Sequence, residues 1–85
     1  MDRYLIESPH TDQECVLILN DCLAAGFLRN FEWGCDDDIH CGWAIIEAEN
    51  HEQASLAVPP LMRKNAKIVK LVKYTDEYVA AIHKP

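Results

Sequence analysis

The sequence predicts a single α+β domain whose elements follow the order β-α-β-β-α-β, with a short helix at the C-terminal end. Two segments begin with the residue spacing of a helix capping box, and four others are short runs of β-branched, aromatic and aliphatic residues. The chain has 85 residues, and a chain of this size supports only one hydrophobic core. Residues 1–85 are therefore expected to form one domain.

The first strand and the first helix are delimited by local signals. Residues 3–7 form a β run, which Ser8-Pro9 should end because proline cannot donate to a strand ladder. Thr11 and Glu14 have the spacing of a capping box, and Gly26 is the stop signal of a helix of about fourteen residues. The expected buried stripe of this helix comprises Cys15, Ile18, Leu19, Cys22 and Leu23.

The second and third strands should be joined by a polar turn. Residues 28–33 read as the second strand, and residues 34–39 as the turn. Residues 41–48 are apolar on both faces, as expected for a central strand that is covered on both sides.

The last third of the chain repeats the pattern of helix and strand. Asn50 and Gln53 suggest a second capping box, and Pro59-Pro60 should end the short helix that it begins. Residues 67–74 form the fourth strand, with lysines that suit a sheet edge. Thr75 then caps a terminal helical turn.

This order of elements predicts a ferredoxin-like split βαβ sandwich. The first and third strands become central neighbours, and both helices cover one face of a four-stranded antiparallel sheet. We expect four apolar residues of the central strands to face the helices: Leu5, Ala44, Ile46 and Ala48. The other face would then carry Tyr4, Ile6, Trp43 and Ile45, with Phe31 or Trp33.

An uncovered apolar face has a physical consequence. Burying each such side chain is worth about 1.5 to 3 kcal/mol, so leaving the set in water is a liability for a small domain. The sequence therefore predicts a homodimer formed through the open sheet face, with a ligand pocket on that face as the alternative.

Charge and composition argue against several classes of function. The net charge of -6 repels phosphate backbones and anionic lipids, so neither nucleic acid nor a membrane is an expected partner. The N-terminus lacks the pattern of a secretory signal, and a cytoplasmic location is expected. In a reducing compartment the four cysteines should be free thiols or metal thiolates.

The predicted topology brings metal-ligating side chains to one end of the sheet. The end of the first strand, at His10, should lie beside the start of the third, at His40, with Cys35 in the adjoining turn and Cys15 in the first helical turn. Thiolates and imidazoles are the ligands that zinc and nickel prefer. The predicted metal ligands are therefore His10, Cys15, Cys35 and His40, with Cys41 as a possible replacement for Cys15.

Other interpretations of these residues stay open. Cys15 could be a packing residue, and either histidine a polar linker or turn residue. Cys35 and Cys41 could form a disulfide across the turn, and the acidic run from Asp36 to Asp38 should raise the pKa of both thiols. His51 and His83 are expected to be surface residues away from this end.

Four segments carry a resemblance to a family of small uncharacterised bacterial and archaeal proteins with dimeric ferredoxin-like folds. They are residues 4–11, 31–35, 40–48 and 58–63. In that family Gly-Asp-His-Thr precedes the third strand; His40 matches this pattern and Cys41 departs from it. The chain is more distantly similar to small nickel-binding proteins of the same fold. The resemblance implies a dimeric α/β-barrel fold and a metal site.

The sequence thus favours a transition-metal-binding protein, with zinc or nickel as the ion, over an enzyme. One alternative is a dimeric α/β-barrel enzyme, an isomerase or a monooxygenase-like protein, with His10 or His40 as general base and a substrate held by Tyr4, Trp33 and Trp43. Another is a dimerisation domain without chemistry.

Overall fold

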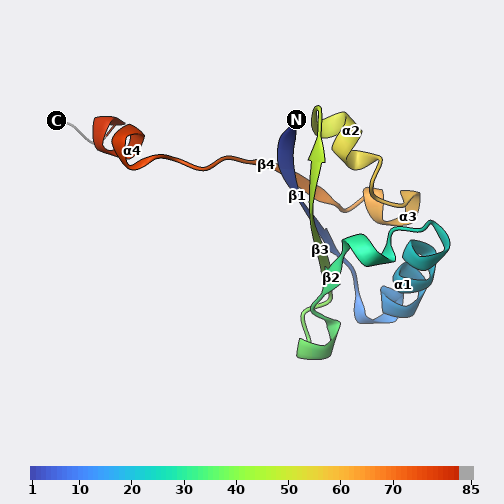
Figure 1. Cartoon of the computed structure of the whole chain (residues 1–85). Coiled ribbons are helices and arrows are strands. Elements are labelled where there is room, and N and C mark those ends of the chain that lie inside the picture. Colours follow the sequence, from blue (N-terminus) through green and yellow to red (C-terminus); the bar gives the residue numbers. More distant parts are fainter. Residues whose placement is uncertain (83–85) are drawn as a thin grey trace.

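The computed structural model describes residues 1–82 as an α+β fold built on a four-stranded antiparallel sheet of order β2-β3-β1-β4 (Figure 1). The strands are β1 (Asp2–Pro9), β2 (Glu32–Trp33), β3 (Cys41–Ala48) and β4 (Lys67–Leu71). The α-helices are α1 (Cys15–Ala24), α2 (His51–Ser55), α3 (Pro60–Arg63) and α4 (Asp76–Ile82). Three short 3-10 turns complete the fold: η1 (Asp12–Glu14), η2 (Leu28–Asn30) and η3 (Cys35–Asp37).

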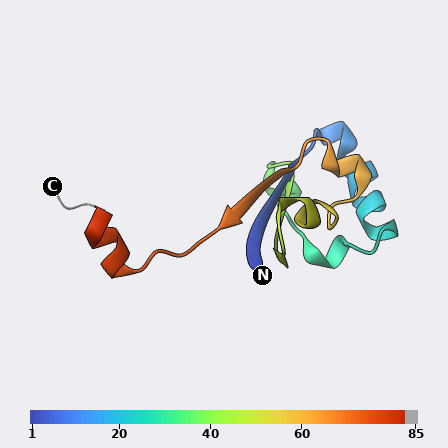
Figure 2. The ribbon, with the colours of Figure 1, turned by 90° about the horizontal axis from the view of Figure 1, so that it is seen from above.

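Helices α1, α2 and α3 lie on one side of the sheet, whereas α4 lies apart from the body at the end of an extended segment (Figure 2). The central strands β1 and β3 run antiparallel, with Ile6 opposite Ala44 and Pro9 opposite Cys41. The expected arrangement of the first and third strands is therefore confirmed. Among residues 1–82, no helix is long and apolar enough to cross a lipid bilayer.

The prediction of which β1 side chains face the helices is wrong. Tyr4 and Ile6 are buried beneath the helices, and Leu5 lies on the opposite face. The physical reason is the register: directly opposed residues of an antiparallel pair point to the same side, and Ile6 is paired with Ala44. The side chains of Phe31 and Trp33 also pack against the core instead of the open face.

The buried core fills the space between the sheet and the helices. Its larger cluster draws residues from β1, α1, the end of η2, β3 and the segment around α3: Ile6, Ile18, Cys22, Phe31, Ala44, Val58 and Met62. Cys22 is fully buried there as a packing residue. Leu23, expected on the buried stripe, is 61% exposed.

Several element boundaries differ from the expected ones. Residues 28–30 form the turn η2 instead of strand, and β2 has only two residues. The helix α2 ends at Ser55, before the expected stop at Pro59-Pro60, and Pro60 instead begins α3, because proline at the first helical position loses no hydrogen bond. The fourth strand ends at Leu71 instead of residue 74.

Candidate metal centre

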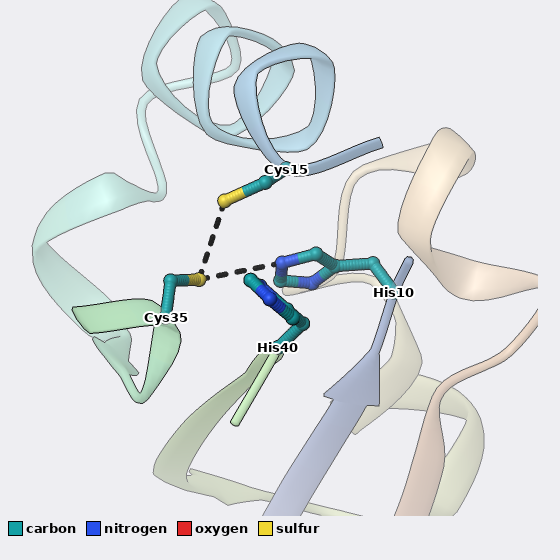
Figure 3. A group of neighbouring side chains, drawn as sticks. All are labelled: His10, Cys15, Cys35 and His40. Carbon is teal, nitrogen blue, oxygen red and sulfur yellow. Dashed lines mark hydrogen bonds between the residues drawn. The ribbon is translucent and has the colours of Figure 1, made fainter. Parts of the chain in front are cut away.

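Four side chains from four separate segments converge at one end of the sheet (Figure 3). His10 follows β1, Cys15 is the first residue of α1, Cys35 begins η3, and His40 precedes β3. One nitrogen or sulfur atom from each lies within 4.8 Å of the corresponding atom of every other. These are the four ligands predicted from the sequence, and the structure brings them together.

The measured separations are close to those of ligands around one ion. The sulfur atoms of Cys15 and Cys35 are 3.3 Å apart, and the Cys35 sulfur lies 3.4 Å from Nε2 of His10. Bond lengths of about 2.3 Å to sulfur and about 2.0 Å to nitrogen put tetrahedral ligands roughly 3.5 to 3.8 Å apart. Small side-chain movements would therefore make room for an ion between these atoms.

The strand ladder fixes the two histidines as neighbours. The His10 backbone N–H donates to the His40 carbonyl at 2.9 Å, which continues the pairing of β1 with β3 beyond Pro9 and Cys41. The centroids of the two imidazole rings are 5.9 Å apart. Their proximity thus follows from the antiparallel register of two central strands.

The tight turn η3 positions Cys35. The Gly34 N–H donates to the Cys41 carbonyl at 3.0 Å, and the Asp38 N–H donates to the Cys35 carbonyl at 3.1 Å. Asp38 has a φ of 62°, in the left-handed region that Asp tolerates better than most residues. This conformation returns the chain toward β3 and leaves the Cys35 side chain directed at His10.

A capping box positions Cys15. The Thr11 hydroxyl accepts from the Glu14 N–H at 3.2 Å, and the Glu14 carboxylate accepts from the Thr11 N–H at 2.8 Å. The reciprocal bonds fix the direction in which the chain enters α1. Cys15 follows immediately, so its thiol is held over the end of the sheet.

The histidine nitrogens have different surroundings. Nδ1 of His10 and Nδ1 of His40 are buried and have no hydrogen-bond partner among residues 1–82. Nε2 of His40 lies 3.5 Å from a carboxylate oxygen of Asp12. Leaving a buried polar atom unpaired costs about 1 to 3 kcal/mol, so the site has unsatisfied ligand capacity.

The thiol of Cys35 is neutral at pH 7 in this arrangement. Burial raises its pKa to about 11, and the hydrogen bond with Cys15 and the nearby charge of Cys15 add to the increase. The expected contribution of the acidic run is present but small, since Asp36 raises this pKa least among the causes. A neutral thiol is a poor nucleophile, and this disfavours a catalytic thiolate.

Cys41 is not part of the cluster. Its thiol is buried and donates weakly to the Gly42 carbonyl at 3.7 Å, and burial raises its pKa. All four cysteines are free, so the disulfide considered between Cys35 and Cys41 is not formed. Cys15 is the thiol that approaches Cys35.

Asp12 is a neighbour of His40 that the sequence did not predict. Asp12 lies within the capping sequence Thr11–Glu14, so a contact with His40 was not expected of it. Its position two residues after His10 nevertheless puts it at the same end of the sheet. His51 lies elsewhere, against Tyr4 with ring centroids 4.9 Å apart, and it is exposed as expected. His83 lies outside the described residues.

A separate hollow on the open sheet face has a volume of about 380 Å³. It is lined by Leu5, Arg29, Asn30, Glu32, Trp43, Ala44 and Ile45. None of the four clustered His and Cys residues belongs to this lining. The hollow therefore offers no potential general base from the cluster, and Tyr4 is buried in the core instead of facing a substrate.

Comparisons with known proteins add no functional assignment. No protein-family model, no curated protein and no solved structure matches this chain. The geometry of the site is therefore the basis for assigning a function.

Proposed function

We propose that this protein binds one divalent transition-metal ion, zinc or nickel, through His10, Cys15, Cys35 and His40. The observation that carries the proposal is the mutual proximity of four ligand atoms, all within 4.8 Å of one another. The unpaired Nδ1 atom of His40 supports it, because an ion would satisfy a buried nitrogen that has no partner among residues 1–82.

The donor set favours zinc of the two ions. Two thiolates and two imidazoles form a neutral complex with a divalent cation, and a tetrahedral set of two sulfurs and two nitrogens is typical of zinc. Four protein ligands also fill the coordination sphere, which is the pattern of a structural site. Binding would release the proton of the Cys35 thiol, so affinity would fall as the pH falls.

The proposal extends to fold type and location. The strand order, with two central strands and helices on one face, supports a ferredoxin-like assignment. The four free thiols suit a reducing compartment such as the cytoplasm. Both statements are consistent with a metal thiolate site.

Metal analysis of the full chain, purified without a polyhistidine tag and reloaded with zinc or nickel, tests the proposal. We expect one ion per chain in the unmodified protein and in the controls His51→Ala and Cys41→Ser, because neither residue touches the cluster. His40→Ala and Cys35→Ser should each lose most of the bound metal. Full stoichiometry in both of these variants would reject the ligand set.

A thiol redox pair is the second candidate, favoured by the 3.3 Å separation of the Cys15 and Cys35 sulfurs. Oxidation by hydrogen peroxide would remove two hydrogens from the two thiols, form one S–S bond and yield two waters. The raised pKa of Cys35 argues for slow reaction at pH 7. Rapid disulfide formation in protein that binds neither zinc nor nickel would favour this function instead.

A further inference from the structure

The open face of the sheet and the C-terminal arm both have apolar surface that no other part of residues 1–82 covers. The first is the open face of the sheet, defined here as Leu5, Trp43, Ile45 and Val69. Ile45 is 58% exposed and Val69 is 38% exposed. The second is the C-terminal arm, defined here as residues 72–82, in which every residue is exposed.

The arm has the pattern of a segment that docks on a surface. Tyr78, Val79 and Ile82 lie at the spacing i, i+1 and i+4, which places them on one apolar side of α4. Tyr74 stacks on Tyr78 with ring centroids 5.1 Å apart. A helix of seven residues is too short to be stable alone in water, so α4 needs a surface to pack against.

The arm does not return to its own sheet. It leaves β4 as an extended segment and projects away from the body (Figures 1 and 2). Residues 72–75 are Val-Lys-Tyr-Thr, which contain none of the residues that favour a tight turn, such as Gly, Pro, Asn or Asp. β-Branched and aromatic residues favour continued extension. The arm is therefore built to reach another molecule.

From these observations we propose that the arm docks on the open face of a second copy of this chain, which gives a homodimer with two exchanged arms. A second copy supplies the missing partner for both surfaces at once, and a twofold axis makes the exchange reciprocal. Arg29 and Glu32 both line the hollow on that face, and α4 begins with Asp76 and Glu77, so Arg29 is the group there that would pair with the acidic start of the arm.

Sedimentation equilibrium of the full chain tests this assembly, and the result should be the same with metal or with a chelator. We expect about twice the chain mass of 9.7 kDa for the unmodified protein. Tyr78→Asp on the arm and Ile45→Asp on the open face should each give monomers. The control Leu56→Asp should stay dimeric, because Leu56 is 55% exposed but lies on neither surface.

Mixing the two monomeric variants distinguishes exchange from other arrangements. The Ile45→Asp chain keeps an intact arm and the Tyr78→Asp chain keeps an intact open face, so an equimolar mixture should form heterodimers through one restored contact. Circular dichroism should show that each variant is folded. A monomeric unmodified protein, a dimeric Tyr78→Asp variant, or a mixture that stays monomeric would each overturn the proposal.

Discussion

His40 is the residue whose surroundings say most about the site. Its Nε2 lies 3.5 Å from Asp12, and its Nδ1 is buried without a partner among the described residues. Metal-ligating histidines usually donate the other ring N–H to a carboxylate, which fixes the tautomer and the ring orientation. In the proposed site, Nδ1 of His40 would be the ligand atom and Asp12 the orienting group.

Replacing Asp12 should therefore weaken metal binding without removing a ligand. For Asp12→Ala we expect affinity for zinc to fall by about 10- to 100-fold, with one ion still bound at saturation. Competition with a chromophoric chelator measures the change. Asp37→Ala removes an exposed carboxylate from η3 and should have little effect. Equal losses in both variants would mean that Asp12 acts only through overall charge.

At the scale of elements, the site depends on how α1 begins and how β2 meets β3. The capping box of Thr11 and Glu14 lies directly before Cys15, and it lowers the pKa of the Glu14 carboxyl because the Thr11 N–H stabilises the charged form. On the other side, the Trp33 ring lies over Gly42, where no side chain intervenes. Both local arrangements position the segments that carry the clustered residues.

The lowered pKa of Glu14 predicts a pH-dependent stability. Its charged form favours the folded state, so the contribution is present above the usual pKa of 4.5 and is lost as the pH falls through the lower folded value. In metal-free protein, Glu14→Gln should lower the urea midpoint at pH 7, and the difference should shrink below pH 4.5. Glu49→Gln, outside any capping box, is the control. A difference that is independent of pH would contradict this account.

Gly42 is required because the indole of Trp33 occupies the space of a side chain. A Cβ at this position would lie 2.7 Å from Cζ3 of Trp33, and the Trp33 ring is 6.1 Å from that of His10. Gly42→Ala should cost about 1 to 3 kcal/mol and also weaken zinc binding, because the indole must move near His10.

Gly26→Ala is the matched control for this variant. Gly26 has a φ of 83°, and a Cβ added there would meet nothing within 4 Å, so its substitution strains the end of α1 without touching the cluster. It should lower the free energy of unfolding and leave zinc affinity unchanged. Urea unfolding and chelator competition measure the two quantities. Unchanged zinc affinity in Gly42→Ala would show that the indole moves away from His10.

For the whole molecule, the cluster joins segments that are far apart in the chain. His10 follows β1, Cys15 begins α1, Cys35 lies in η3, and His40 precedes β3. One bound ion would therefore connect both central strands to the helical layer. A chain of 85 residues has a small core, and a structural metal is a common source of stability at this size.

Metal binding should therefore raise the melting temperature. Zinc at 100 times its dissociation constant adds about 2.7 kcal/mol, which corresponds to a rise of about 10 to 20 °C for a domain of this length. Thermal melts followed by circular dichroism, with zinc or with a chelator, measure the shift. Cys35→Ser should show a much smaller shift than His51→Ala. Equal shifts in these two variants would mean that the ion stabilises the fold elsewhere.

Much of the fold and the site could be predicted because the signals are local. Thr11, Gly26, Asn50 and Thr75 mark helix ends through hydrogen bonds that span only a few residues, and each mark is found in the structure. The extent of β3 follows from its continuous apolar run. Because the first and third strands pair antiparallel, the proximity of His10 to His40 could also be predicted.

The sequence by itself thus determined the types of most of the main elements, some of their ends, and the meeting of His10, Cys35 and His40 at one end of the sheet. Only the tertiary structure decided which face of β1 is buried, that Cys15 and not Cys41 approaches Cys35, and that Asp12 lies beside His40. The reason is that a shift of one residue in strand register reverses every side chain, and nothing local to β1 encodes the position of its partner.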